Sequence, residues 1–446
     1  MAERTNSKDE PLQLKKAYLV GLRKDGESEE FARGLLDELA ELVENIGFEV
    51  AGSICVNLRE PNPHYLVGAG KFAEIRREAK KLKADCIVFD DSITPAQQRN
   101  WEHETRKCVI DRQEVILEIF ARRATTKEAR LQVELARLVY SLPRLKRAWT
   151  HLSRQRGGGV TQRGAGESQL ETDRRRVVER ISRLKKDIEL VGKVRATQRK
   201  RRDRSDIPTV AIVGYTNAGK SSLMNYLSGA GVLAENKLFA TLDPTTRELK
   251  LPSGSSVLIT DTVGFVRRLP HNFIDAFKST LEEAAFADLL IHVVDASNSD
   301  AHLHVKTTME VLSQLGANEK PCITLLNKID AVKDPFALHA LKFDCPDSIE
   351  ASIKNKEGMD KLIARLEDFV SDKAKTMKFL VPHSNYKLIT LLEDFGAVRK
   401  KAYCHEGVAV CACVPVRFVS AVKSGARILD DFEFGEIIEK ELVFTP

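Results

Sequence analysis

The chain has 446 residues, of which 43% are hydrophobic and 30% charged, and its formal net charge is +6. This length is typical of two to four globular domains. No run of about 18 apolar residues occurs and the opening stretch, MAERTNSKDEPLQLKK, is polar, so we expect neither a membrane-spanning helix nor a secretory signal. The eight cysteines form no CxxC pair, which argues against a zinc site and fits reduced thiols in the cytoplasm.

Short apolar runs alternate with helical patterns over residues 16–125, which predicts an N-terminal α/β domain spanning residues 1–125. Strands are predicted over 16–22, 49–58, 64–67 and 84–91. Amphipathic helices are predicted over 31–47, over 71–82 and from Pro95 onward, with Thr94 as the N-cap of the last. Because strands and helices alternate, we expect a mostly parallel sheet.

Two features of this domain could bind ligands. Gly68-Ala69-Gly70-Lys71 lies between a predicted strand and a predicted helix, where it could hold an anion such as ATP or form a tight structural turn. Asp90 and Asp91 end a predicted strand, and we expect them to begin a loop rather than to bind a metal.

Two narrow apolar stripes with charged flanks follow between about residue 126 and residue 200, as in paired helices. The first stripe is Leu131, Leu135, Leu138, Leu142 and Leu145, and the second is Val177, Ile181, Leu184, Ile188 and Val191. They predict an antiparallel helical hairpin linker over residues 126–204, with the stretch SRQRGGGVTQRGAGES (153–168) at its tip. A basic linker then ends at Pro208.

The glycine-rich stretch 153–168 lacks a GK[ST] ending and a preceding buried strand, so it is a poor phosphate loop. Arginine binds phosphates and stacks on bases, and glycine allows close backbone approach, so Arg154, Arg156 and Arg163 are candidates for RNA contact. A solvated loop without a partner remains the alternative. Further basic residues flank the stretch, namely Arg144, Lys146, Arg147, Arg174, Arg175 and Arg176.

A buried strand, Val210 to Val213, runs into Gly214-x-x-x-x-Gly219-Lys220-Ser221 and then into a helix, which is the setting of a P-loop. Backbone N–H groups of such a loop surround the phosphates, Lys220 reaches the β- and γ-phosphates, and Ser221 ligates Mg²⁺. The predicted nucleotide-binding residues here are Gly214, Tyr215, Thr216, Asn217, Ala218, Gly219, Lys220, Ser221 and Ser222.

The base is specified by a later strand, which ends in Asn327-Lys328-x-Asp330. The carboxylate of Asp330 can accept hydrogen bonds from guanine, whereas adenine offers no such donor pair, so GTP and GDP are the expected ligands. Asn327 would bind guanine or brace the P-loop, and the stem of Lys328 would cover the base. Main-chain N–H groups of Ser352-Ile353-Lys354 could also contact the base.

The γ-phosphate and Mg²⁺ are expected to meet two switch segments. Asp261 ends a strand, where it can hold Mg²⁺ through water, and it is followed by Thr262, Val263 and Gly264. Gly264 can offer its N–H to the γ-phosphate. The other segment is an extended loop that contains three candidate metal ligands, Thr241, Thr245 and Thr246.

Two residues of the G domain raise mechanistic questions. Phe265 follows Gly264 where many GTPases have a glutamine that orients the attacking water, so intrinsic hydrolysis is expected to be slow. Asn217 could help to coordinate K⁺ beside the phosphates or could form a loop-stabilising Asx turn.

These residues resemble the HflX family in the Obg–HflX group of GTPases. The resemblance covers nearly the whole chain and rests on GYTNAGKSSL, FATLDPTTR, DTVGFVRRLP, NKID and the stretch 153–168 with its continuation GESQLETDRR. It implies a first switch formed by Phe239, Ala240, Thr241, Leu242 and Asp243. It also implies that Thr241 is the Mg²⁺ ligand and that Phe265 replaces the glutamine. We expect Lys220, Thr241 and Gly264 to be the catalytic residues. The chain departs from the usual SAK-like loop at Ile353.

The resemblance further implies binding to the large ribosomal subunit near the peptidyl-transferase centre and a role in splitting stalled ribosomes under stress. The expected architecture is α/β and multidomain, with a Ras-like P-loop GTPase domain over residues 205–372 and a small α+β domain over 373–446. In the last domain a helix is predicted over 381–396 and a strand over 407–416.

Two functions compete at this point. One is a GTPase switch that docks on ribosomes in its GTP state, and the other is an RNA-binding or RNA-remodelling protein with a separate ATP site in the N-terminal domain. We expect a cytoplasmic monomer that associates with ribosomes or peripherally with a membrane.

Overall fold

The computed structural model describes residues 15–147, 163–202, 207–229, 238–239, 242–268, 283–394, 398–415 and 419–444. Contacts divide the chain into two compact units, which are described in turn. The first contains residues 1–188, 236–239 and 267–277, and the second contains residues 189–235, 240–266 and 278–446. Within the described residues, no helix is both long enough and apolar enough to cross a lipid bilayer.

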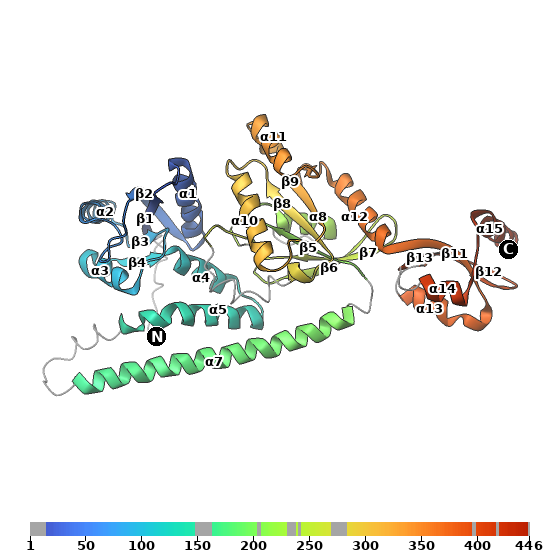
Figure 1. Cartoon of the computed structure of the whole chain (residues 1–446), viewed down its shortest axis with the longest axis horizontal. Helices are drawn as coiled ribbons and strands as arrows, with labels where there is room; N and C mark the ends of the chain where they lie inside the picture. Colours follow the sequence, from blue (N-terminus) through green and yellow to red (C-terminus); the bar gives the residue numbers. More distant parts are fainter. Residues whose placement is uncertain are drawn as a thin grey trace, which may run out of the picture. The chain divides into compact units, whose positions relative to one another are not determined.

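The first unit is built around a four-stranded parallel sheet in the order β2-β1-β3-β4 (Figure 1). Its strands are β1 (Lys15–Lys24), β2 (Phe48–Leu58), β3 (Cys86–Phe89) and β4 (Cys108–Asp111). Its helices are α1 (Glu29–Asn45), α2 (Ala69–Lys81), α3 (Pro95–Thr105) and α4 (Arg112–Arg123). The prediction of an α/β domain with a mostly parallel sheet is confirmed.

The central strands β1 and β3 are buried on both faces, since consecutive residues along each of them are buried. On one face, Phe72 and Ile75 of α2 and Trp101 of α3 complete the core against β1 and β3. Helix α3 begins as predicted, since the hydroxyl of Thr94 accepts from the N–H of Gln97 and the Gln97 side chain returns the bond as a capping box.

The strand predicted over 64–67 is wrong. The side-chain oxygen of Asn62 accepts from the N–H groups of His64 and Tyr65, at 2.8 and 3.2 Å, which folds the chain into a turn. Leu66 has a left-handed φ of 68°, and only an isolated bridge joins it to Asn62. The local side-chain hydrogen bonds therefore outweigh the apolar pattern here.

The predicted helical hairpin begins with α5 (Lys127–Ser141), continues as the 3-10 helix η1 (Leu142–Arg147) and resumes with α7 (Arg163–Arg202). Its apolar stripe ends earlier than predicted, because Leu142 and Leu145 lie in the 3-10 helix. Helix α7 also begins inside the stretch 153–168, which was predicted to be a loop throughout. Residues 148–162, including the glycine triplet, lie outside the described residues.

The second apolar stripe is visible along α7. Leu184 is buried and Val177, Ile181, Ile188 and Val191 are half-buried, whereas most residues between them are exposed. Arg180 of α7 forms a two-pronged ion pair with Glu134 of α5, with N–O distances of 2.8 and 3.0 Å. The two helices are thus joined by an apolar seam and by at least one charged pair.

The second unit contains a six-stranded sheet in the order β10-β9-β8-β5-β7-β6, in which only β6 is antiparallel (Figure 1). Its strands are β5 (Thr209–Gly214), β6 (Thr245–Lys250), β7 (Ser256–Asp261), β8 (Leu289–Asp295), β9 (Cys322–Asn327) and β10 (Ile349–Glu350). Its helices are α8 (Lys220–Ser228), α10 (Ala301–Gln314), η2 (Ile329–Ala331), α11 (Pro335–Asp344) and α12 (Met359–Lys373).

A buried core on one face of this sheet joins the central strands to α8 and α12. Leu223 of α8 and Leu362 and Leu366 of α12 are fully buried there. The strands β5, β8 and β9 are central and parallel, so their carboxyl ends meet at one edge of the sheet. That edge is where the predicted nucleotide motifs lie.

A four-stranded antiparallel sheet follows, in the order β12-β13-β11-β14. Its strands are β11 (Ala374–Val381), β12 (Val398–Cys404), β13 (Gly407–Pro415) and β14 (Arg427–Ile428). Its helices are η3 (His383–Asn385), α13 (Lys387–Asp394), α14 (Val419–Gly425) and α15 (Asp431–Phe444). The helix predicted over 381–396 is therefore shorter than expected, because Val381 belongs to β11 and Pro382 precedes η3.

Candidate guanine-nucleotide site

The phosphate loop connects β5 to α8 and requires glycine at two positions. Gly214 has φ 145°, and a β-carbon there would lie 2.2 Å from the carbonyl oxygen of Val293. Gly219 has φ 105°, and a β-carbon there would lie 2.3 Å from the amide nitrogen of Asn327. Both conformations are left-handed and both spaces are filled, so the motif's glycines follow from sterics alone.

Lys220 and Ser221 open α8 at the end of this loop. The buried ammonium group of Lys220 donates to the carbonyl oxygen of Tyr215 over 2.6 Å. Burial lowers the pKa of Lys220 to about 8, and the nearby Asp261 carboxylate opposes that shift. The hydroxyl of Ser221 donates to Asp261 over 2.9 Å. The cation and the two oxygen ligands expected around a nucleoside triphosphate are therefore brought together.

His292 of β8 lies behind the loop, and nothing in the sequence pattern points to it. Its side chain is 1% exposed, and burial, together with the charge of Lys220, lowers its pKa to about 4. The imidazole is therefore neutral near pH 7 and adds no positive charge beside Lys220.

The base loop is held by side chains at the ends of β9 and β10. Asn327 donates to the carbonyl of Ala218 in the phosphate loop over 2.8 Å, and its oxygen accepts from the N–H of Ile353 over 3.2 Å. Of the two roles predicted for Asn327, the structure shows bracing of the P-loop. Lys328 has a left-handed φ of 63° and forms an ion pair with Asp295 at 2.7 Å.

Asp330, the residue predicted to select guanine, is oriented by Ser352. The buried Ser352 hydroxyl donates to the Asp330 carboxylate over 2.6 Å and holds the pKa of Asp330 below its usual value. The same hydroxyl accepts from the N–H of Asn355, which closes the loop around it. The ionised form needed to accept from guanine is therefore favoured.

The larger residue at position 353 fits the loop. The half-buried Ile353 side chain packs against the apolar core of the sheet. Its N–H is engaged by Asn327, so the main-chain geometry of the loop is kept. The core of the sheet thus accommodates Ile353, the residue at which this chain departs from the SAK-like pattern.

The segment after β7 is held against the phosphate loop. The N–H of Thr216 donates to the Phe265 carbonyl over 2.8 Å, and the N–H of Phe265 donates to the Gly214 carbonyl over 3.1 Å. A β-carbon at Gly264 would lie 2.8 Å from the ammonium nitrogen of Lys220. The Phe265 ring is 1% exposed, so it is part of the packed interior.

Thr262 and Val263, two predicted site residues of the same segment, are buried as well. Thr262 is buried, and its hydroxyl donates to the carbonyl of Ile212 over 2.7 Å. Val263 is buried beside it. Thr262 is thus tied to the strand that leads into the phosphate loop.

The first switch is described only in part, since Ala240 and Thr241 lie outside the described residues. Phe239 belongs to the first unit, where its ring meets that of Phe120 edge-on at 4.8 Å and its φ is 56°. Leu242 is buried and Asp243 half-buried, in the second unit. The alternative ligand Thr246 lies in β6, and its hydroxyl is 2.9 Å from that of Thr260.

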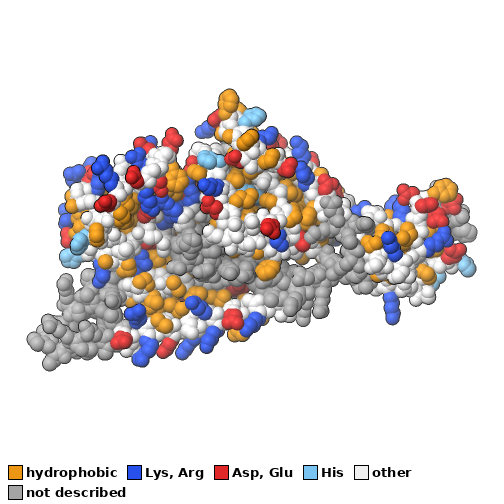
Figure 2. Space-filling view, viewed as in Figure 1, with side chains coloured by type: hydrophobic (Ala, Val, Ile, Leu, Met, Phe, Trp, Pro, Cys, Tyr) orange, Lys and Arg blue, Asp and Glu red, His pale blue; other side chains and the backbone are white. Residues whose placement is uncertain are grey.

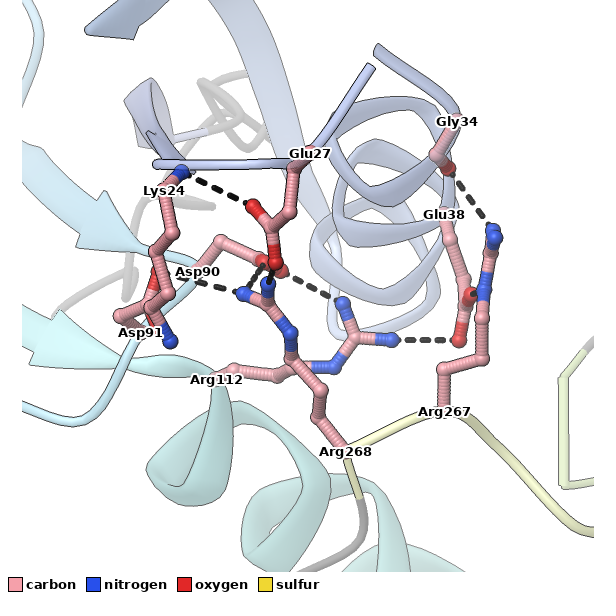
Figure 3. Close-up of polar contacts among 9 residues, drawn as sticks. All are labelled: Lys24, Glu27, Gly34, Glu38, Asp90, Asp91, Arg112, Arg267 and Arg268. Carbon is pink, nitrogen blue, oxygen red and sulfur yellow. Dashed lines mark hydrogen bonds and ion pairs between the residues drawn. The ribbon is translucent and has the colours of Figure 1, made fainter. Parts of the chain in front are cut away.

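The chain after Phe265 and Val266 enters a buried ionic cluster in the first unit (Figure 3). Arg267 donates to Glu38 over 2.9 Å and to the carbonyl of Gly34. Arg268 binds Asp90 and Asp91 at 3.0 and 3.1 Å, and it also binds Glu27. The sequence pattern did not indicate these pairs, because their partners are more than 170 residues apart.

Arg112 links two carboxylates of this cluster. Its guanidinium donates to both Glu38 and Asp90, and it is 2% exposed. Burial raises the pKa of Asp90, and Arg112 and Arg268 partly offset that rise. Asp90 and Asp91, expected only to begin a loop, are thus structural partners of arginines.

Two of the three predicted RNA-contact residues lie outside the described part of the chain. Arg154 and Arg156 lie outside the described residues, and Arg163 is the first residue of α7. Arg144 is instead a structural residue, because it binds the buried Asp111 at 3.3 Å and stacks on Tyr140. Figure 2 shows Lys and Arg side chains along α7. The exposed ones are Arg174, Arg175, Arg176, Arg180, Arg183, Lys185, Lys186 and Lys193.

The Gly68–Lys71 segment forms the start of α2. Gly68 is the N-cap, and the ammonium group of Lys71 pairs with Glu74 at 2.8 Å. Of the two roles considered, this geometry is that of a structural helix start.

Comparisons with known proteins agree along the chain. Three family models match: "GTP-binding GTPase N-terminal" over residues 34–121, "GTP-binding GTPase Middle Region" over 123–202 and "50S ribosome-binding GTPase" over 209–328. GTPase HflX of Akkermansia muciniphila is 45% identical over 428 residues, covering 94% of this chain and 98% of that one. The chain belongs to the HflX family of GTPases.

A second curated relative and one solved structure are also similar to parts of this chain. GTPase HflX of Lacrimispora saccharolytica is 44% identical, covering 90% of this chain and 95% of that one. A crystal structure of a GTP-binding protein from Sulfolobus solfataricus in complex with GDP is 26% identical, with a TM-score of 0.43, covering 80% of this chain and 98% of that chain. As a member of this family, the chain binds GTP and hydrolyses it.

Proposed function

We propose that this GTPase binds the large ribosomal subunit in its GTP state, and that hydrolysis releases it, so that it splits or rescues stalled ribosomes under stress. The supporting observation is a candidate guanine-nucleotide site in a chain whose long helix α7 exposes more Lys and Arg than Asp and Glu side chains among those described. The family model matched over residues 209–328 is described as a 50S ribosome-binding GTPase. On this proposal the protein acts in the cytoplasm as a monomer.

We propose four functional parts, residues 1–125, 126–204, 205–372 and 373–446. The glycine-rich stretch 153–168 would contact ribosomal RNA through Arg154, Arg156 and Arg163, because arginine neutralises phosphate and stacks on unpaired bases. Arg144 fixes the 3-10 helix η1, which precedes this stretch along the chain, to the first unit.

The nucleotide would be held by the residues predicted from the motifs, and Mg²⁺ fits the site. A hydroxyl at Ser221 and a carboxylate at Asp261 are the hard oxygen ligands that Mg²⁺ prefers. We propose that Ser221 and Thr241 hold Mg²⁺ directly and that Asp261 holds it through water. Bound Mg²⁺ would neutralise charge on the β- and γ-phosphates.

A role for K⁺ at Asn217 is a separate part of the proposal. Asn217 has a left-handed φ of 60°, which an asparagine adopts readily, so its backbone conformation alone accounts for the residue. Equal rates of GTP hydrolysis in K⁺ and Na⁺ buffers would remove the K⁺ role.

No observation on the described residues favours a separate ATP site, since Lys71 is engaged with Glu74 at the start of α2. The GTPase switch is therefore proposed without the RNA-remodelling alternative.

The experiment is co-sedimentation with purified large subunits in the presence of a non-hydrolysable GTP analogue. Replacing Arg154, Arg156 and Arg163 by Glu should weaken binding and lower the slope of log affinity against log salt by about 2 to 3. GTP affinity should not change. A control with the same change of charge replaces three exposed lysines of the G domain, Lys306, Lys333 and Lys361, by Glu. Equal co-sedimentation of the two variants would reject the docking proposal.

A further inference from the structure

The C-terminal sheet exposes cations and aromatic rings along its edge strand β12. Arg399, Lys400 and Lys401 follow one another in this strand and are all exposed. The register shifts between Val398 and Lys400, which marks a bulge at this point. Bulges redirect side chains, so consecutive cations can line the same hollow.

That hollow has a volume of about 290 Å³ and is lined by Glu393, Val398 and the three cations. Glu393 is engaged by Lys401 at 2.9 Å, so the lining keeps a surplus of positive charge. An anionic partner is therefore favoured over a cationic one.

Two tyrosines continue the same edge. Tyr386 and Tyr403 are 40% and 49% exposed, and their hydroxyl oxygens are 3.4 Å apart. The Lys401 ammonium lies 5.9 Å from the centre of the Tyr403 ring. Ala402, between Lys401 and Tyr403, is buried against α15, so these two side chains belong to the opposite face.

Protection of a sheet edge explains only part of this surface. Lysines on edge strands prevent pairing with other chains, which accounts for the cations. Exposed tyrosines do not serve that purpose, because aromatic side chains favour strand association. Rings beside cations are what single-stranded nucleic acids require, since bases stack on the rings and phosphates meet the cations.

We propose that this surface, the β12 patch (Tyr386, Arg399, Lys400, Lys401 and Tyr403), binds a single-stranded segment of RNA. The patch is independent of the glycine-rich stretch 153–168. It would give the protein a second RNA contact, in which Tyr386 and Tyr403 stack on bases and the three cations hold the backbone.

The test is a fluorescence-anisotropy titration of the full chain with a labelled 12-nucleotide single-stranded RNA of mixed sequence. Replacing Arg399, Lys400 and Lys401 by Glu should weaken binding at least about tenfold and lower the salt slope by about 2. The Lys306, Lys333 and Lys361 to Glu variant should bind as the unaltered chain does. Equal affinity of these two variants would overturn the proposal.

The rings are tested separately. Replacing Tyr386 and Tyr403 by Ala should weaken binding at least about thirtyfold, because two stacked bases lose their platforms. Replacing both by Phe keeps the rings and should leave affinity within about twofold. Full affinity of the alanine variant would show that no base stacks there and would overturn the proposal.

Two further measurements separate this inference from the proposed ribosome docking. The same RNA titration is made with Arg154, Arg156 and Arg163 replaced by Glu, and binding through the β12 patch should persist. If the β12 charge reversal weakens co-sedimentation with large subunits but not RNA binding, the partner is an acidic protein surface and the RNA proposal fails. If replacing Arg154, Arg156 and Arg163 by Glu leaves co-sedimentation unchanged, the docking role of stretch 153–168 is rejected. The proposal for the β12 patch is not affected by that result.

Discussion

Asn327 joins the phosphate loop to the base loop, since its side chain donates to Ala218 and accepts from Ile353. The side chain is 3% exposed, so these bonds form away from water. A single amide at the end of β9 thus couples the two loops that are expected to hold the phosphates and the base.

Replacing Asn327 by Ala should therefore weaken GDP binding about five- to hundredfold, because it leaves a buried carbonyl and a buried N–H without their partner. A titration with fluorescent GDP measures this loss. Asn355→Ala, at an exposed position of the same loop, is the control and should bind within about twofold of the unaltered chain. Equal binding by the two variants would contradict the bracing role.

The pH dependence of guanine binding should shift when Ser352 is replaced by Ala. Ser352 holds the pKa of Asp330 below its usual value, and only the ionised carboxylate accepts from guanine. Without the hydroxyl this pKa rises, so affinity should begin to fall at a higher pH as the solution is acidified. GDP titrations between about pH 4 and pH 7 test this shift. Identical pH profiles would show that Ser352 does not tune Asp330.

Phe265 should not act in catalysis. Its ring is 1% exposed in the interior, and a hydrocarbon ring cannot orient water. Phe265→Leu keeps an apolar side chain there and should leave basal GTP turnover within about tenfold, whereas a residue that acts on the attacking water contributes more. The truncation Phe265→Ala should stay within the same range if the chain still folds. A thousandfold loss in the leucine variant would make the ring catalytic.

The ionic cluster should stabilise the first unit. Arg112→Leu leaves Glu38 and Asp90 buried without one of their cations and should lower the free energy of unfolding by about 3–5 kcal/mol. Arg33→Leu removes an exposed pair with Glu29 and should cost less than about 1 kcal/mol. Trp101, buried in this unit, reports unfolding by denaturant through its fluorescence. Equal midpoints would contradict the role of Arg112.

The sequence allowed the nucleotide motifs to be placed because their chemistry is local. The left-handed backbone of Gly214 and Gly219 belongs to a turn of a few residues, and Thr94 caps a helix through a residue three positions away. Such signals need no knowledge of the rest of the fold. The same holds for the apolar stripe along α7, which repeats at the helical period.

Other features depend on contacts that no local pattern contains. The bond from Arg267 to Glu38 joins residues 229 positions apart, and the burial of His292 follows from the order of the strands. The strand predicted over 64–67 was wrong for a local reason. The side chain of Asn62 accepts hydrogen bonds from N–H groups two and three residues away, and the resulting turn outweighs the apolar pattern. Thr246 also depends on register, since its pairing with β7 places it in the sheet.

Rates of GTP and ATP hydrolysis, each measured with and without purified large ribosomal subunits, test the central claim most directly. We predict that the subunits raise GTP turnover at least about tenfold, that ATP is not hydrolysed, and that Lys220→Ala abolishes the GTP reaction. GTP turnover that large subunits leave unchanged, or ATP turnover that survives Lys220→Ala, would contradict the account.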